Sequence, residues 1–366
     1  MTRIQRRRRT LLVLTTTAAL ACTGVAASAA APDTDASPRT DRSRPLAGLR
    51  VLLTNDDSMR AVKPSNSDGL GLYEIRKALC DAGADVVALV PWQVQSGKGT
   101  AVTNGGTLSL SPRPQPLAGY EKDCSGTPSG SPVYGVCLAT GPCGPDSPSA
   151  TPVDTVKFAL RGGLAAKAGW KDGPDLVVTG INSGPNISAQ VNDSGTVGAA
   201  LAAIDEGVPA LALSSSGDAS QLTFPVANYR AHARFAAGLI GGLRERDLLT
   251  DRFALKVDYP DVSAGQKAKP PVWTSIGHGK IVWHAYEART PGGDLFDIVP
   301  GVCDNEPASD CTETVGNADS TALLGQGRIA IAPVTADRAY GVRTSGAGQR
   351  DLARLKWYVE HEAPRS

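Results

Sequence analysis

Two adjacent aspartates follow an apolar run near the start of the chain. The segment VLLTNDDS covers residues 51–58, so Asn55, Asp56 and Asp57 come directly after the apolar residues. Two neighbouring carboxylates repel each other unless a positive charge lies between them, and a divalent cation supplies such a charge. A turn rich in Asx residues explains the same letters, because these residues favour turns after strands. The motif alone leaves a metal site and a turn as alternatives.

Two more strand-like runs end in polar residues that suit the same cation. Ser96 follows the run 85–90, and both Asn182 and Asn186 follow the run 175–179. Because the carboxyl ends of neighbouring parallel strands share one crevice, we expect these side chains to converge with the two aspartates. All the donors are oxygen atoms, which favours Mg²⁺, Mn²⁺ or Ca²⁺ over zinc and copper. The sequence therefore predicts one divalent-cation site.

A helix start lies a few residues further along the chain. Ser194, Gly195 and Thr196 precede the Ala-rich stretch 197–206, which has good helix propensity. The first turn of a helix presents free N–H groups and the positive end of the dipole, and the two hydroxyls add donors. We expect a phosphate to bind there, with Asn186 as a further contact. An ordinary serine cap with nothing bound is the alternative.

Alternating strand-like and helix-like segments surround these motifs. They predict an α/β fold with a Rossmann-like, doubly wound, mostly parallel sheet and a smaller C-terminal β-rich extension. A Thr-Pro pair with an aspartate two residues later marks one of the helix starts. The expected strands cover residues 49–54, 85–90, 175–180, 209–214, 253–258 and 328–333, and the expected helices cover residues 70–82, 152–168, 195–206, 226–246 and 349–360.

The N-terminus has the pattern of a secretory signal peptide. Residues 1–29 combine a basic start, an apolar stretch and an A-S-A cleavage site ending at Ala29. The Sec and Tat routes both fit this pattern. Cleavage near Ala29 would remove five arginines and no acid, so the formal charge would change from +1 to 1 − 5 = −4. We therefore expect an extracellular protein without a nucleic-acid or membrane partner.

The rest of the chain is expected to have a leader and one large catalytic region. Residues 30–45 are rich in Asp, Ser, Thr, Arg and Pro, a composition typical of disorder. Residues 46–250 are expected to form the α/β catalytic domain, with an inserted segment at 120–150. Residues 251–366 are expected to contribute further strands, a hairpin extension and a terminal helix.

Six cysteines remain after the signal peptide, and an even number in an exported chain favours disulfides over metal binding. We expect Cys303 to pair with Cys311, because the loop between them is short. A second pair is expected among the three cysteines of the segment 120–150, and Cys80 is expected to be a buried thiol. The six are Cys80, Cys124, Cys137, Cys143, Cys303 and Cys311.

Four sequence blocks, in this order, resemble the SurE family of metal-dependent 5′/3′-nucleotidases, also called survival protein E. The blocks are LLTNDD at 52–57, VPWQVQSG at 90–97, TPVDTV at 151–156, and VVTGINSGPNIS with DSGTVGAALAA within 177–203. The resemblance extends over roughly residues 48–340. It implies that the divalent cation is held by Asp56, Asp57, Ser96 and Asn182.

The resemblance also implies an activity. It predicts a secreted phosphomonoesterase that hydrolyses nucleoside monophosphates, with Asp56, Asp57 and Asn186 as catalytic residues. Either aspartate remains a candidate general base or nucleophile. A phosphatase of broader specificity, acting on polyphosphate or other phosphomonoesters, and a non-catalytic nucleotide-binding protein remain alternatives. Hairpins from residues 267–306 would join subunits into a homodimer or homotetramer.

Several other enzyme classes lack their motifs here. The aspartates are adjacent rather than spaced as D-x-D, which argues against a haloacid-dehalogenase-type phosphatase. The chain has no G-x-S-x-G and no G-x-G-x-x-G after a strand. One departure from the SurE pattern lies at the acidic pair itself, where Ser58 follows the aspartates and the family usually has glycine.

Overall fold

The computed structural model describes most of the chain beyond the N-terminal region. The described residues are 44–59, 69–113, 117–218, 223–302 and 311–337, with five further positions between 350 and 357. They all belong to one unit, residues 40–366. The expected signal peptide and nearly all of the expected leader lie outside the described residues.

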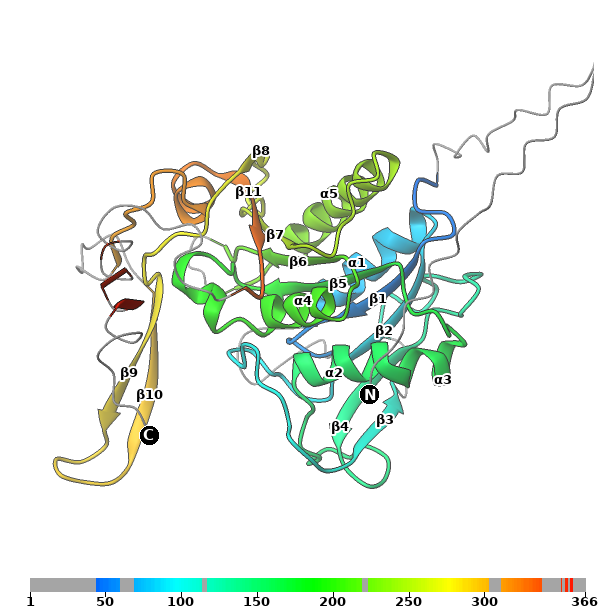
Figure 1. Ribbon diagram of the computed structural model, residues 1–366, viewed down its shortest axis with the longest axis horizontal. Coiled ribbons are helices and arrows are strands. Elements are labelled where there is room, and N and C mark those ends of the chain that lie inside the picture. The colour runs from blue at the N-terminus through cyan, green and yellow to red at the C-terminus, as the bar shows by residue number, and fades with distance from the viewer. Residues whose placement is uncertain are drawn as a thin grey trace, which may run out of the picture. The chain divides into compact units, whose positions relative to one another are not determined.

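Nine strands form one sheet in the order β3-β4-β2-β1-β5-β6-β7-β11-β8 (Figure 1). The six strands from β4 to β7 in this order are parallel, whereas β3 and β11 run antiparallel to their neighbours β4 and β7. The predicted α/β fold with a mostly parallel sheet is therefore confirmed. The strands are β1 Arg50–Thr54, β2 Asp85–Pro91, β3 Leu108–Pro112, β4 Val133–Leu138, β5 Leu176–Ser183, β6 Ala210–Ser215, β7 Ala254–Tyr259, β8 Lys269–Trp273 and β11 Arg328–Val334.

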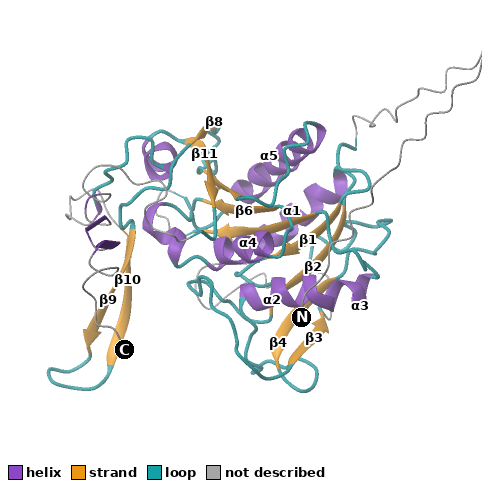
Figure 2. Cartoon of the chain, viewed as in Figure 1, coloured by secondary structure: helices purple, strands orange, loops and turns teal. Residues whose placement is uncertain are grey.

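Helices cover both faces of this sheet (Figure 2). Val51 and Leu53 of β1 pack in the core that includes residues of α1 and α5, and the intervening Leu52 packs in the core that includes residues of α2 and α4. Because both faces are covered, β2 is buried at every position, as expected for a central parallel strand. The helices are α1 Leu70–Asp81, α2 Pro152–Phe158, α3 Leu164–Ala168, α4 Gly195–Asp205 and α5 Val226–Glu245, with π-helical segments at Ala159–Gly163 and Thr321–Gly325 and a 3₁₀ segment at Ser188–Asn192.

The segment 120–150 differs from the expected insertion, because it contributes strand β4 to the sheet. Its strand signal is weak because a glycine, Gly135, interrupts the apolar run. A Cβ atom at Gly135 would lie 2.4 Å from the ring of Trp92, so the glycine makes room for that indole. Strands β3 and β8 were also not predicted from the sequence.

Two disulfides link parts of this region. Cys137 pairs with Cys143, within the expected group of three cysteines. The expectation for Cys80 was wrong, because it is bonded to Cys124, 44 residues further along the chain. Helix α1 and the loop before β4 meet here, a tertiary contact that no local pattern reveals. Cys303 lies outside the described residues, so its pairing with Cys311 stays a prediction.

The C-terminal part contributes to the large sheet and to a separate hairpin. Strands β7, β8 and β11 all follow residue 250 and extend the sheet. Strands β9, Val282–Ala288, and β10, Phe296–Val302, pair antiparallel as a two-stranded sheet. Of the expected helix 349–360, the five described positions are helical and the others lie outside the described residues. No helix among the described residues has the length and hydropathy that a membrane span requires.

Candidate functional site

The acidic pair lies immediately after β1. Asp56 and Asp57 are 3% and 0% exposed. The side chain of Asn55 holds the turn: its amide donates to the Ile181 carbonyl at 3.2 Å, and its Oδ1 accepts the Asp57 N–H at 3.1 Å. Asn55 thus joins the end of β1 to β5, the neighbouring parallel strand. The two carboxylates are therefore fixed at the carboxyl ends of adjacent strands.

Asp56 receives two hydrogen bonds from the start of α4. The hydroxyl of Thr196 donates to Oδ1 at 2.6 Å and the Thr196 N–H donates to Oδ2 at 3.1 Å. A Cβ atom at Gly195 would lie 2.9 Å from Asp56 Oδ2, so only a glycine allows the helix to come this close. The positive end of the helix dipole stabilises a carboxylate at this position.

Asp57 receives hydrogen bonds from two further strand ends. The hydroxyl of Ser96, after β2, donates to Oδ1 at 3.2 Å. The N–H of Ser183, at the end of β5, donates to Oδ2 at 2.6 Å. The structure thus brings the predicted Ser96 to the acidic pair and adds Ser183, whose contact uses its backbone and leaves no residue-type signal.

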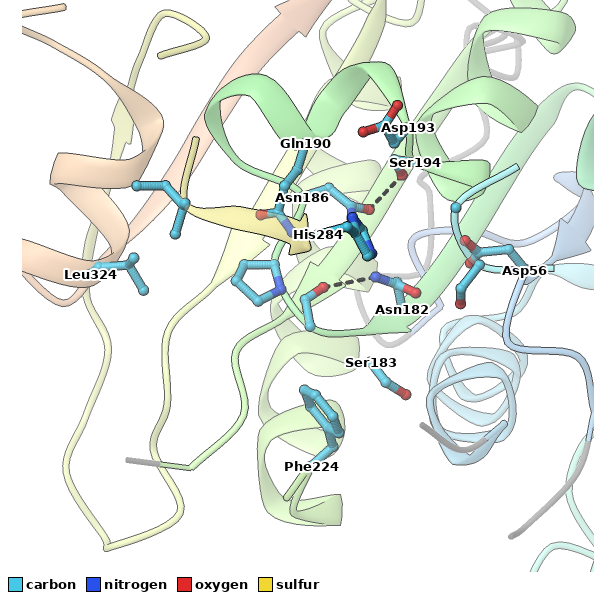
Figure 3. A pocket seen from close by; sticks show the side chains of 15 residues that line it. Asp56, Asn182, Ser183, Asn186, Gln190, Asp193, Ser194, Phe224, His284 and Leu324 are labelled. Carbon is cyan, nitrogen blue, oxygen red and sulfur yellow. Dashed lines mark hydrogen bonds between the residues drawn. The ribbon is translucent and has the colours of Figure 1, made fainter. Parts of the chain in front are cut away.

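Asn182 presents an oxygen atom to the same place. Its amide nitrogen donates to the Gly184 carbonyl at 2.8 Å, and its carboxamide oxygen is directed toward Asp56 (Figure 3). The chain therefore offers two carboxylates, a hydroxyl and a carboxamide oxygen, a donor set that fits Mg²⁺, Mn²⁺ or Ca²⁺. Among the described residues, no group of three or more His, Cys, Asp and Glu side chains could hold a metal. This agrees with a set that has only two carboxylates.

Asn186 is oriented by two serine hydroxyls. Its Oδ1 accepts from Ser194 at 2.7 Å and from Ser214 at 2.9 Å. The Ser194 hydroxyl itself accepts the N–H of Val197 at 3.0 Å, so its proton points to Asn186. This arrangement fixes which end of the amide is the oxygen and leaves the N–H groups of Asn186 as donors.

A cavity of about 380 Å³ is lined by Asp56, Ser96, Asn182 and Asn186, whereas Asp57 does not line it (Figure 3). One side, which we call the polar wall, comes from the strand ends and the start of α4. The other side, which we call the apolar wall, includes Phe224, Ile281, His284 and Leu324. The polar wall consists of Asp56, Ser96, Gly97, Asn182, Ser183, Gly184, Pro185, Asn186, Gln190, Asp193 and Ser194.

The predicted phosphate-binding residues lie at different depths. Ser194 lines the cavity and is the N-cap of α4, as predicted. Gly195 and Thr196 are buried behind it, and the Thr196 hydroxyl is engaged by Asp56. The phosphate-binding role of these three residues stays a prediction. Their helix start is confirmed.

A buried ionic network lies behind the polar wall. Lys256, Asp258 and Asp319 are each 0% exposed. Lys256 contacts Asp258 closely and lies 2.9 Å from Asp319 Oδ2. Asp258 Oδ1 also accepts the N–H of Asn186 at 2.8 Å, so the network reaches the polar wall. Burial raises the pKa of Asp258 to about 6, although Lys256 opposes the rise.

The histidines occupy different environments. His232 is fully buried, and burial lowers its pKa to about 3. His284 lines the cavity of its own chain, and His278 is exposed. His361 lies outside the described residues. Trp92 donates to the Gly144 carbonyl at 2.6 Å and packs against the core rather than lining the cavity.

Comparisons with known proteins agree with this geometry. The family model described as survival protein SurE matches residues 51–282, which contain all four sequence blocks. A 5′-nucleotidase SurE from Nitratidesulfovibrio vulgaris strain Hildenborough is 32% identical over 295 residues, 79% of this chain and 94% of the relative. A 5′-nucleotidase SurE from Rubrobacter xylanophilus is 29% identical over 317 residues, 83% of this chain and 96% of the relative.

A solved structure supports the fold. The crystal structure of the SurE protein from Aquifex aeolicus superposes with a TM-score of 0.55 at 21% sequence identity, covering 85% of this chain and 99% of that chain. At this identity the likeness shows the shared fold alone. The family match over 51–282, together with a relative that is 32% identical and is matched over 94% of its own length, shows that this chain belongs to the SurE family.

Proposed function

We propose that this protein is a divalent-metal-dependent phosphomonoesterase that hydrolyses nucleoside monophosphates to nucleoside and phosphate. The observation that carries the proposal is the convergence of oxygen donors from three strand ends on one cavity. The names of the SurE relatives, which are 5′-nucleotidases, support the choice of substrate.

Several residues at the cavity have a proposed role. Asp56, Asp57, Ser96 and Asn182 would hold Mg²⁺ or Mn²⁺, with Ca²⁺ a further candidate; the cation would polarise the phosphoryl group and lower the pKa of water. Asn186 donates its amide N–H groups to a phosphate oxygen and stabilises the charge that develops in the transition state. Ser194 keeps Asn186 in this orientation, and the start of α4 adds its positive end. Asp56 lines the cavity, so it is the carboxylate placed to accept a proton.

The apolar wall supports a nucleoside as the leaving group. Phe224, Ile281 and Leu324 line the cavity, and Leu324 lies across it from Asp56 (Figure 3). Binding cavities of a few hundred Å³ commonly combine an apolar surface with a few fixed polar groups, an arrangement that suits a nucleobase with its sugar phosphate. A polyphosphate chain would gain nothing from these three side chains.

Phosphate release from adenosine monophosphate tests the proposal. We expect turnover with Mg²⁺ or Mn²⁺, no turnover after EDTA treatment, and recovery when the cation is restored. Full activity after thorough chelation would contradict the metal assignment. Tight binding of the nucleotide without phosphate release would instead identify a non-catalytic binding protein.

We also propose that the protein is exported and that its subunits associate. The two disulfides in the described residues support an oxidising destination. Tyr286, Phe296 and Ile298 of the β9–β10 hairpin are 69%, 57% and 65% exposed, which supports association into a homodimer or homotetramer through this hairpin.

Three measurements check these proposals. N-terminal sequencing of protein from the medium should begin near residue 30, and thiol counting on the denatured, unreduced protein should find at most two free thiols. Light scattering should give a mass of two or four chains. Five or six free thiols, or a monomeric mass, would contradict the corresponding proposal.

A further inference from the structure

The two walls of the cavity come from distant parts of the chain. The polar wall continues into Ser188, which begins the short helix after Asn186. The apolar wall receives Ile281 and His284 from the segment that leads into the hairpin, and Leu324 from the π-helical segment that follows Asp319. The separation between the walls decides how large a molecule fits between them.

One carboxylate, that of Glu313, contacts both sides. Its Oε2 accepts from the Ser188 hydroxyl at 2.8 Å and from the Gly279 N–H at 3.2 Å. Its Oε1 accepts the His278 N–H at 3.0 Å. Burial alone would raise the pKa of Glu313, but hydrogen bonds from His278, Val315 and Ser188 among others hold it at about 2, so the group is ionised at neutral pH.

Asp319 makes a second connection between the same segments. Its Oδ1 accepts the Ser188 N–H at 3.1 Å and the Gly277 N–H at 3.0 Å. Its Oδ2 is held by Lys256 at 2.9 Å, in the buried network that also contacts the backbone of Asn186. The two carboxylates thus bind one segment from each side of the cavity.

These segments pack tightly against each other at Gly277. A Cβ atom at Gly277 would lie 2.0 Å from Glu313 Oε2 and 2.3 Å from the Ser188 hydroxyl. Any side chain at Gly277 would therefore displace Glu313 or Ser188. Such close packing fixes the distance between the two segments. They cannot separate without losing these contacts, and they cannot move closer without a steric clash.

We propose that Glu313 and Asp319 form a clasp that fixes the separation of the two walls and thereby selects a nucleoside as the leaving group of the phosphomonoester. Neither residue lines the cavity, so both are positioning residues. The inference rests on the proposed function and adds the determinant of its substrate size. It also assigns a role to residues that lie 119 positions or more from the polar wall in sequence.

Two variants test the clasp. Glu313→Gln removes the charge and keeps the shape, and Ser188→Gly removes one hydroxyl. Glycine is chosen at Ser188 because its φ of 51° lies in the left-handed region, which glycine adopts without strain. Glu287→Gln, an exposed substitution of the same type on β9, is the matched control.

The measurement compares kcat and KM for adenosine monophosphate and for glycerol 2-phosphate, with Mg²⁺ present. In both clasp variants we expect KM for the nucleotide to rise by roughly tenfold, the effect of one charged hydrogen bond. We expect kcat for adenosine monophosphate to change little. We expect kcat and KM for glycerol 2-phosphate to change by less than KM for the nucleotide. The kcat/KM value for adenosine monophosphate divided by that for glycerol 2-phosphate should therefore fall in the clasp variants. This ratio should stay at the wild-type value in Glu287→Gln.

The outcomes separate the two proposals. A ratio equal to the wild-type ratio in both clasp variants overturns the clasp and leaves the proposed function standing. A wild-type protein without metal-dependent turnover of either substrate overturns the proposed function and this inference with it. If Glu313→Gln fails to fold, as judged by its melting transition, Ser188→Gly alone decides the result.

Discussion

The polar wall and the clasp both depend on carboxylates, but they are assembled in opposite ways. Asp56 and Asp57 follow a strand whose ladder with its parallel neighbours fixes where it ends. Glu313 lies in irregular backbone, Asp319 begins the short helical segment before β11, and both are fixed by contacts of their side chains. The polar wall therefore follows from sheet topology, whereas the clasp depends on tertiary packing.

The acidic pair and the buried ionic network behind the polar wall also stabilise their charges differently. The hydrogen bonds described above for the acidic pair come from hydroxyl and amide donors. Asp258 and Asp319 instead share the fully buried Lys256. Charge pairs of this kind add little net stability when intact but cost much when broken. We therefore expect substitutions at the polar wall to affect activity, and substitutions in the buried network to affect stability.

The largest expected effect is that of Asp57→Asn on activity. Loss of a metal-binding carboxylate removes several kcal/mol of transition-state stabilisation, so kcat with Mg²⁺ should fall on the order of 1,000-fold. The melting temperature should not fall, because the variant relieves repulsion between two buried carboxylates. Asp172→Asn, at an exposed carboxylate away from the cavity, is the control. A kcat near the wild-type value would show that the acidic pair is part of a turn and does not hold a catalytic metal.

Lys256→Met should show the opposite behaviour. The substitution leaves two carboxylates buried without their common counter-charge, which costs about 3–5 kcal/mol of unfolding free energy. Urea denaturation measures this loss, and Lys171→Met, at an exposed lysine, serves as the control. Adding Asp258→Asn to the variant should restore part of the stability. A loss of unfolding free energy below about 1 kcal/mol would show that removing Lys256 does not destabilise the fold. That result would contradict the expected difference between the acidic pair and the buried network.

A third test uses the buried His232, whose Nδ1 lies 3.1 Å from the Ser215 hydroxyl while its Nε2 has no protein partner. Its folded pKa of about 3 lies below the usual value of about 6.5, so the unfolded chain takes up the proton first as the pH falls. Stability should therefore decrease below pH 6.5, by up to about 1.4 kcal/mol per pH unit. In His232→Gln this contribution disappears.

Other groups titrate near the same range, so the comparison uses the difference between wild type and variant. The raised pKa of Asp258, about 6, acts with the opposite sign but is common to both proteins. Glu313, with a pKa of about 2, affects stability below the usual carboxylate range and thus outside a window of pH 6.5 to 5. Equal slopes in wild type and His232→Gln over this window would show that His232 does not control the dependence.

The smallest expected effect concerns Ser58, which follows the acidic pair. Its φ of 64° is left-handed, which explains why the family usually has glycine here, and its hydroxyl contacts the Pro91 carbonyl at 2.8 Å. Ser58→Ala keeps the backbone strain and loses the hydrogen bond, so it should cost about 1 kcal/mol. Ser58→Gly loses the bond but relieves the strain, so its net effect should be about zero. A higher melting temperature for Ser58→Ala than for Ser58→Gly would contradict this account.

Asp56, Asp57, Ser96 and Asn182 could be predicted to lie together because each of them follows an apolar run in the sequence. Asn182 needed only the rule that parallel strands end at the same edge. The clasp could not be predicted in this way. Glu313 lies in a stretch without periodicity, and Lys256 has the position of an ordinary strand residue although both faces of β7 are buried. Its contact with Asp319, 63 residues further along the chain, exists only in the folded protein.

Strand β8, which ends the large sheet on one side, has a consequence for contacts between molecules. Its sequence KPPVW contains Pro270 and Pro271, neither of which has a backbone N–H to donate. At the opposite edge of the sheet, strand β3 ends at Pro112. Strands with prolines resist pairing with a strand from another copy, a common route to aggregation. Growth of the sheet from molecule to molecule is thus blocked by the amino acids at its margins, a useful property for a protein with six parallel strands at its centre.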